Sequence, residues 1–336
     1  MDIHIALPDD VDVSEIEGIA GLLHGQTSRF RSFDLHVRIR YELEEFIALI
    51  VERRPAPLLE SLELRVQRCT SYDTVFHFDT FLTAFRPAPR LAHIEILGWP
   101  LPKPLSQLPN MTSFTIDSMS LDSIHIHKII LFLSSTPSIQ HFVYKGHGKL
   151  YTATDLNDPY VVHLPDLITV NVTVPGSGTD LLCLINAPAP TDARLDGFRT
   201  HNFEGLRKGS LTDAILLLST HLRNLRRLTL EYTEFLETPG GFETIFNDIS
   251  FPQLEKVLLI ATNITDYALM NARRNSGLKR LEMRDCEWVT GTGLLEFVRH
   301  RGSDFSLSLQ SCRNLNITQE DMDAISETVI KVDGLH

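Results

Sequence analysis

Apolar residues recur in a fixed pattern over residues 277–312. The first copy holds Leu278, Leu281, Met283 and Cys286, and the second holds Asp304, Leu307, Leu309 and Cys312. Alternating side chains over such a short run are typical of a half-buried strand. Between the two cysteines, positions 290–298 carry apolar residues at helical spacing. The pattern therefore predicts a strand, a loop and a helix that recur as one unit.

The strand pattern can be followed along the whole chain. Its fourth position falls at Phe33, Leu62, Ile94, Phe114, Phe142, Val170, Phe198, Leu228, Val257, Leu281 and Leu307. Three consecutive steps, from Phe114 to Phe198, are each 28 residues long. A period of this size and the spacing L-x-x-L-x-L-x-x-C match the leucine-rich-repeat template. We therefore predict an α/β leucine-rich-repeat solenoid (horseshoe), with a parallel sheet on its concave face and helices on its convex face.

The pattern predicts that the chain is divided into three segments. Residues 1–27 are predicted to form an N-terminal capping segment, in which a short strand precedes a helix that begins with a capping box of Ser14 and Glu17. Residues 28–328 are predicted to form the solenoid of about eleven repeats, and residues 329–336 its C-terminal end. The unit around Phe198 has the weakest pattern, because glycine and polar residues interrupt its apolar positions.

The charge balance and the composition limit the classes of partner and location. The chain has 31 basic and 43 acidic residues, a formal net charge of −12, and no basic stripe of the kind that binds nucleic acid. No apolar run approaches the roughly 20 residues of a membrane helix, and residues 1–15 lack the blocks of a signal peptide. Four cysteines do not indicate a disulfide framework. We therefore expect a cytoplasmic or nuclear protein that binds neither nucleic acid nor membrane.

Candidate catalytic chemistry is sparse. The glycine-rich stretch 174–180 follows a predicted strand, but it lacks the lysine of a phosphate-binding loop. His125 and His127 are two residues apart on a predicted helix, whereas helical metal ligands are spaced by four. No Ser-His-Asp set and no pair of catalytic carboxylates stands out. We expect a protein that is not an enzyme and that has no cofactor and no metal site.

The C-terminal half resembles a known family. The stretches LRRLTLEYT, LEKVLLIATNITDYAL, LKRLEMRDCEWVTGTGL and SLSLQSCRNLNIT are similar to the cysteine-containing leucine-rich repeats of F-box proteins. The N-terminal half, with SRFRSFDLHV and APLLESLELRV, resembles the divergent fungal F-box/leucine-rich-repeat family. In that family an F-box recruits the adaptor of a ubiquitin ligase, and the repeats hold the substrate. The resemblance implies the substrate-recognition region of such a receptor, or a diverged relative.

The F-box itself is expected to be absent. An F-box needs about forty residues, and only some thirteen precede the first predicted helix. The resemblance therefore implies a ubiquitin-ligase adaptor as a partner only if an F-box lies upstream.

Strand alternation selects the candidate binding residues. In the last repeats, the side chains that point away from the core include four cations on an otherwise acidic protein. The residues predicted to bind a partner on the concave face are Arg227, Glu231, Lys256, Arg280, Glu282, Arg284 and Gln310. In the weak unit, the same rule selects Arg199 and His201. The alternative is an ordinary solvated strand face.

A second set of residues has a predicted structural role. Thr233, Thr262, Cys286 and Cys312 all occupy the ninth position of their repeats. A small polar side chain there can bond loop backbone that would otherwise be buried without a partner. These four residues are predicted to form a structural ladder along the solenoid. A disulfide between Cys286 and Cys312 is disfavoured in a reducing compartment.

Two classes of partner remain open from the sequence. The leading prediction is a protein partner bound by the concave face. The alternative is a small ligand, held in a pocket between the concave face and a long loop at residues 145–160.

Overall fold

The computed structural model describes most of the chain. The residues described are 1–8, 11–51, 55–68, 85, 87–98, 108, 110–118, 124–146, 150–151, 161–173, 178–196, 218–233, 241–247, 249–272, 275–301, 304–312, 315, 318, 320, 323 and 331–333. The chain divides into two compact units, Met1–Ala153 and Thr154–His336. We call them the N-terminal and C-terminal units and describe each by itself.

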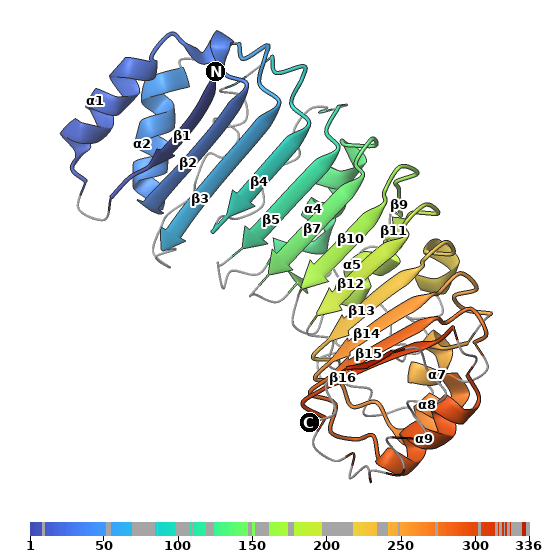
Figure 1. Ribbon diagram of the computed structural model, residues 1–336. Helices are drawn as coiled ribbons and strands as arrows, with labels where there is room; N and C mark the ends of the chain where they lie inside the picture. The colour runs from blue at the N-terminus through green and yellow to red at the C-terminus, as the bar shows by residue number, and fades with distance from the viewer. Residues whose placement is uncertain are drawn as a thin grey trace. The chain divides into compact units, whose positions relative to one another are not determined.

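Parallel strands in chain order build the main sheet of the N-terminal unit (Figure 1). These strands are β1 (Asp2–Ala6), β2 (Ser32–Ile39), β3 (Ser61–Arg68), β4 (His93–Leu97), β5 (Ser113–Ser118) and β7 (His141–Gly146). The helices are α1 (Val13–Leu23), η1 (Thr27–Arg29), α2 (Arg40–Val51) and α4 (Ile126–Ser134). A small parallel pair joins β6 (Ile124–His125) to β8 (Leu150–Tyr151). Each repeat therefore returns to the sheet beside the repeat before it.

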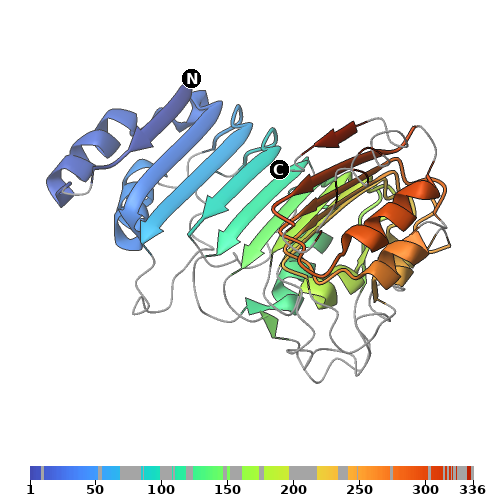
Figure 2. The same cartoon turned by 60° about the horizontal axis from the view of Figure 1, so that its bottom comes forward.

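The C-terminal unit has the same construction. Its main strands are β10 (Thr169–Thr173), β12 (Asp192–Asp196), β13 (Arg227–Glu231), β14 (Lys256–Ile260), β15 (Arg280–Arg284), β16 (Ser306–Gln310) and β17 (Lys331–Asp333), all parallel. Its helices are α5 (Gly178–Cys183), α7 (Gly241–Ile245), α8 (Asp266–Ala272) and α9 (Gly291–Arg299), and a small pair joins β9 (Val162–His163) to β11 (Ile185–Asn186). Figure 2 shows α8 and α9 side by side along one side of the strands. The chain is an α/β leucine-rich-repeat solenoid, as the sequence predicts.

The strand registers confirm most of the predicted repeat positions. In the N-terminal unit, Phe33, Leu62, Ile94, Phe114 and Phe142 occupy equivalent positions on successive paired strands. In the C-terminal unit, the same holds for Leu228, Val257, Leu281 and Leu307. All nine side chains are buried. The apolar alternation of the sequence therefore fixes which side of each strand forms the core.

The prediction for the unit around Phe198 was wrong. Val170 on β10 lies opposite Ala193 on β12, and Ala193 lies opposite Leu228 on β13. The strand of this repeat is therefore Asp192–Asp196, and its marker residue, Ala193, lies five positions before Phe198. Alanine at the marker position gives a weak apolar signal, yet its side chain is buried between its larger neighbours. Phe198 and the candidate residues Arg199 and His201 lie outside the described residues.

The observed end strands and the cap of the first helix can be compared with the prediction. The first strand, β1, pairs with β2, so the predicted short N-terminal strand exists, and β17 pairs with β16 near the C-terminal end. The first helix is capped by Asp12 and Glu15, not by Ser14 and Glu17. Ser14 instead donates its hydroxyl hydrogen to the Asp12 carboxylate, at 2.6 Å. Asp12 takes the cap because its carboxylate accepts from the backbone N–H of Glu15.

A left-handed residue follows several strands at the same repeat position. Tyr232, Ala261, Asp285 and Ser311 have φ of 49°, 49°, 53° and 56°, and Gly98 has φ of 76°. The N–H of Tyr232 donates to the carbonyl of Ile260, and that of Ala261 to the carbonyl of Arg284. The turns after β13 and β14 thus bond to the end of the next strand. This contact offsets the steric cost that a left-handed conformation imposes on a non-glycine residue.

None of the described helices is long and apolar enough to cross a membrane.

Candidate functional site

The predicted binding residues lie on strands β13 to β16 of the C-terminal unit. Register places Arg227, Lys256 and Arg280 in one row across three strands. Arg284 lies opposite Gln310 in a second row. Alternate residues of these strands, such as Leu281 and Leu307, are buried in the core. We call the opposite side of the strands, which carries the predicted binding residues, the open face of this unit.

Three of the cations converge on one buried carboxylate. Lys256 Nζ lies 2.8 Å from Glu282 Oε1, and Arg280 Nε lies 2.7 Å from the same oxygen. An Arg284 guanidinium nitrogen lies 3.5 Å from Glu282 Oε2. The Glu282 side chain is 7% exposed, whereas those of the three cations are 36–45% exposed. We call these four residues the Glu282 cluster.

Electrostatics hold the Glu282 carboxylate in its charged form. Burial by itself raises the pKa of Glu282. The hydrogen bond from Lys256 and the charges of Lys256, Arg280 and Arg284 outweigh burial, so the pKa lies below its usual value. Three positive charges therefore surround one negative charge at neutral pH. The Glu282 cluster keeps a net positive charge on a chain of net charge −12.

Two of the predicted binding residues, Arg227 and Glu231, do not belong to this cluster. An Arg227 guanidinium nitrogen lies 3.7 Å from Asp192 Oδ1 on β12. The Glu231 carboxylate forms an ion pair and hydrogen bond with Arg194, also on β12. Arg227 and Glu231 are therefore paired toward β12 rather than toward the Glu282 cluster. Asp192 and Arg194 were not predicted from the sequence, because the strand of their repeat was expected at Phe198.

A proline signal could have located β12. Seven of the described strands begin four residues after a proline, namely those that follow Pro57, Pro89, Pro109, Pro137, Pro165, Pro188 and Pro252. Where the turn bond is seen, as from Leu59 N–H to the Ala56 carbonyl, proline is the second of its four residues. Proline favours that position of a β-turn because its φ is fixed near the required value.

The ninth-position residues lie in the turns after the strands. Thr233, Cys286 and Cys312 each contact the backbone carbonyl two residues earlier, at 3.3, 3.4 and 3.5 Å. Cys286 Sγ also lies 3.7 Å from the carbonyl of Leu259, and Cys312 Sγ lies 3.7 Å from that of Met283, each in the preceding repeat. Thr262 Oγ1 lies 3.4 Å from Cys286 Sγ. These contacts link the turns of successive repeats.

Cys286 and Cys312 are both free thiols. A hydrogen bond with Cys286 and, to a smaller extent, burial raise the pKa of the Cys312 thiol. Cys312 therefore remains a neutral hydrogen-bonding group in its turn at physiological pH.

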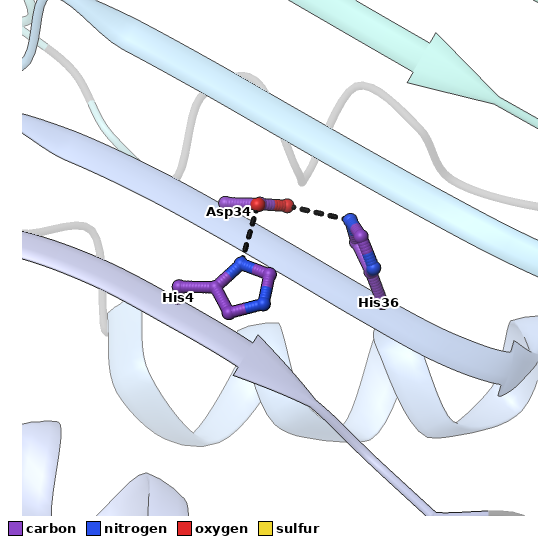
Figure 3. A group of neighbouring side chains, drawn as sticks. All are labelled: His4, Asp34 and His36. Carbon is purple, nitrogen blue, oxygen red and sulfur yellow. Dashed lines mark hydrogen bonds and ion pairs between the residues drawn. The ribbon is translucent and has the colours of Figure 1, made fainter.

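The N-terminal unit carries a second polar network on its strands. Asp34 lies between His4 and His36 in Figure 3. His4 Nδ1 lies 2.5 Å from Asp34 Oδ2, and His36 Nε2 lies 2.9 Å from Asp34 Oδ1. Glu63 and Arg65 on β3 form an ion pair beside them. Among the described residues, His4, Asp34 and His36 offer ligand atoms that all lie within 4.8 Å of one another.

This histidine–aspartate group was not predicted from the sequence. Strand alternation alone would have placed Asp34 and His36 on the same face of β2. The approach of His4 required the register of β1 on β2, which pairs His4 directly with Asp34. The predicted pocket loop cannot be compared in the same way, since residues 147–149 and 152–160 lie outside the described residues.

Comparisons with known proteins give structural neighbours alone. No protein-family model and no curated protein matches the chain. The chain is similar to a Bacteroides fragilis protein of known crystal structure, with a TM-score of 0.49 and 14% identity, over 89% of this chain and 73% of that chain. It is also similar to a chain in the crystal structure of the Rad7 and Elc1 complex in yeast, with a TM-score of 0.42 and 11% identity, over 95% of this chain and 78% of that chain.

Proposed function

We propose that the chain is a non-catalytic protein-interaction scaffold, and that the open face of β13 to β16 binds an acidic segment of a protein partner. The Glu282 cluster is the observation that carries this proposal. Its three cations come from two adjacent strands, β14 and β15, and meet at one carboxylate that is 7% exposed. The fold therefore holds a compact positive surface on an acidic chain.

Fixed cations are well suited to recognition. A free lysine or arginine loses side-chain entropy when a partner orders it, and that loss weakens binding. Contacts with Glu282 restrain Lys256, Arg280 and Arg284 before any partner arrives. Arginine is also enriched among the residues that dominate interface energies. The positive potential of the cluster would speed encounter with an acidic partner and select against a basic one.

The finer proposal concerns the class of partner. The resemblance of residues 222–312 to the repeats of F-box proteins supports a substrate-recognition role in a ubiquitin ligase or a diverged relative. In that role the partner of the open face would be a protein destined for ubiquitination. A ligase adaptor would then be a separate partner, recruited through an F-box.

Affinity capture with matched variants tests the scaffold proposal. The full chain is immobilised, and proteins captured from extract are quantified for wild type, Arg280→Gln/Arg284→Gln and the control Lys279→Gln/Arg299→Gln. Both double variants lose two positive charges from the same repeat, but the control residues lie outside the Glu282 cluster. Wild type and control should capture the same acidic protein, and the cluster variant should capture at least about tenfold less, equivalent to roughly 1.4 kcal/mol.

Two further results decide the interpretation. Binding of the captured protein, once purified, should weaken as salt is raised, because the attraction is between exposed charges. Circular dichroism should show that both double variants are folded. Equal capture by wild type and the cluster variant would refute the role of the Glu282 cluster.

A further inference from the structure

The edge of the N-terminal sheet places three metal-ligating side chains together. His4 on β1 is paired in register with Asp34 on β2, and Ala6 is paired with His36. Residues 34 and 36 are two apart on one strand, so their side chains point to the same side. Among the described strands, β1 lies at the edge of this sheet. The three side chains thus span the contact between the edge strand and its neighbour (Figure 3).

Contacts within the group leave enclosed polar atoms without a hydrogen bond. Among the described residues, Asp34 Oδ1 and His36 Nε2 are buried atoms that make none. They nevertheless lie close together, since His36 Nε2 is 2.9 Å from Asp34 Oδ1 and 3.6 Å from Glu63 Oε1. An imidazole nitrogen at ion-pair distance from two carboxylate oxygens, with no hydrogen bond to either, is an arrangement that a bound cation would satisfy.

We propose that His4, Asp34 and His36 bind a divalent transition-metal ion of the Zn²⁺ class. Two imidazoles and one carboxylate form a donor set that suits Zn²⁺, whereas Mg²⁺ and Ca²⁺ prefer oxygen ligands throughout. Zinc–ligand distances of about 2.0–2.2 Å place tetrahedral donors about 3.3 Å apart. The three ligand atoms already lie within 4.8 Å of one another. A small rotation of His4, whose side chain is 65% exposed, would complete the site.

The site has three protein ligands and one position for water or another donor. Glu63 is the nearest further carboxylate, but it is held in an ion pair with Arg65. The positive charge of Arg65 keeps Glu63 from serving as a full fourth ligand and limits the negative charge of the site. A bound ion would cross-link β1 to β2 through His4. Metal binding would therefore stabilise the edge strand itself.

Zinc titration of the full chain tests this site. The protein is stripped with a chelator and titrated with Zn²⁺ in competition with a chromogenic chelator. The variants are His4→Gln and His36→Gln, with His93→Gln as control, because His93 lies on β4 outside the group. Wild type and the control should bind one Zn²⁺ per chain with equal affinity. Each ligand variant should lose at least the roughly 10–100-fold that removal of a supporting residue costs a metal site.

Amide exchange of β1 gives a second readout. Zn²⁺ should slow exchange at residues 3–6 in wild type and leave it unchanged in His4→Gln. Because His4 is largely exposed, this variant should fold even if His36→Gln does not. Absence of zinc binding in wild type would overturn the proposal. So would an affinity that His4→Gln leaves unchanged, since the ion would then be bound elsewhere.

Discussion

At the scale of the residue, Glu282 shows how one buried carboxylate orders its surroundings. It lies on the open face, where a glutamate would ordinarily be solvated, yet it is 6% exposed. The charged ends of Lys256, Arg280 and Arg284 converge on it. The carboxylate in turn compensates part of their mutual repulsion. Removing it would leave three like charges close together.

Replacement of Glu282 by glutamine should therefore destabilise the C-terminal unit in a pH-dependent way. The folded-state pKa lies below the ordinary value of 4.5, so the contribution of the carboxylate is present above that value and is lost as the pH falls through the folded pKa. Near neutral pH, Glu282→Gln should lower the free energy of unfolding by roughly 1–3 kcal/mol. Urea unfolding of wild type and variant across the acid range measures the difference.

The pH dependence of the stability difference is compared with that of a control variant. The difference between wild type and Glu282→Gln should shrink below pH 4.5, whereas Glu296→Gln, an exposed site on α9, should have a small effect throughout. A difference that stays constant across the acid range would show that the charge of Glu282 is not what stabilises the cluster.

At the scale of the element, neighbouring helices share their caps. Thr290 caps α9 by accepting from the N–H of Gly293, at 3.2 Å. Asp266, in the first turn of α8, accepts from the N–H of Thr290 at 2.8 Å and from its hydroxyl at 2.6 Å. A carboxylate at one helix start thereby orients the capping residue of the next. The close approach explains glycine at 293, where a Cβ would lie 2.2 Å from Asp266 Cγ.

A double-mutant cycle can measure this coupling. Gly293→Ala should destabilise wild type through the clash with Asp266, although alanine ordinarily favours a helix interior by about 1 kcal/mol over glycine. Asp266→Ala alone should cost about 1–2 kcal/mol through the lost cap contacts. In the Asp266→Ala background, Gly293→Ala should become neutral or stabilising. Equal effects of Gly293→Ala in both backgrounds, measured by chemical unfolding, would exclude the coupling.

At the scale of the molecule, stability is carried by contacts between successive repeats. Each inner strand pairs with the strands before and after it in the chain order of its unit. Buried residues at one marker position, such as Leu281 and Leu307, meet across a single register step. In such an architecture, damage to one repeat is felt first by its immediate neighbours.

Leu281→Ala tests the range of that coupling. The side chain is fully buried, so its truncation should cost about 2–5 kcal/mol through lost burial and a cavity. Hydrogen exchange should quicken in β14, β15 and β16 and stay nearly unchanged in β2 to β5. Equal loss of protection over the described strands would indicate one cooperative core instead of a repeat array.

The sequence by itself determined the repeat class, most strand positions and the side of each strand that is buried. These features are encoded locally: apolar side chains alternate along the strands, and a proline fixes the turn that leads into seven of the described ones. Where the apolar signal of a strand was weak, as at Ala193, the strand was wrongly predicted around Phe198. Burial of that alanine depends on Val170 and Leu228, which are distant in sequence.

Only the tertiary structure decided which polar side chains meet. Strand alternation placed Lys256, Arg280, Glu282 and Arg284 on one face, but their convergence on Glu282 depends on register and side-chain conformation. The approach of His4 to Asp34 joins residues 30 positions apart. Alternate side chains of a strand are buried, so the buried positions can be predicted from a single sequence. Polar contacts between strands depend on how distant segments align, and that alignment is a property of the folded chain.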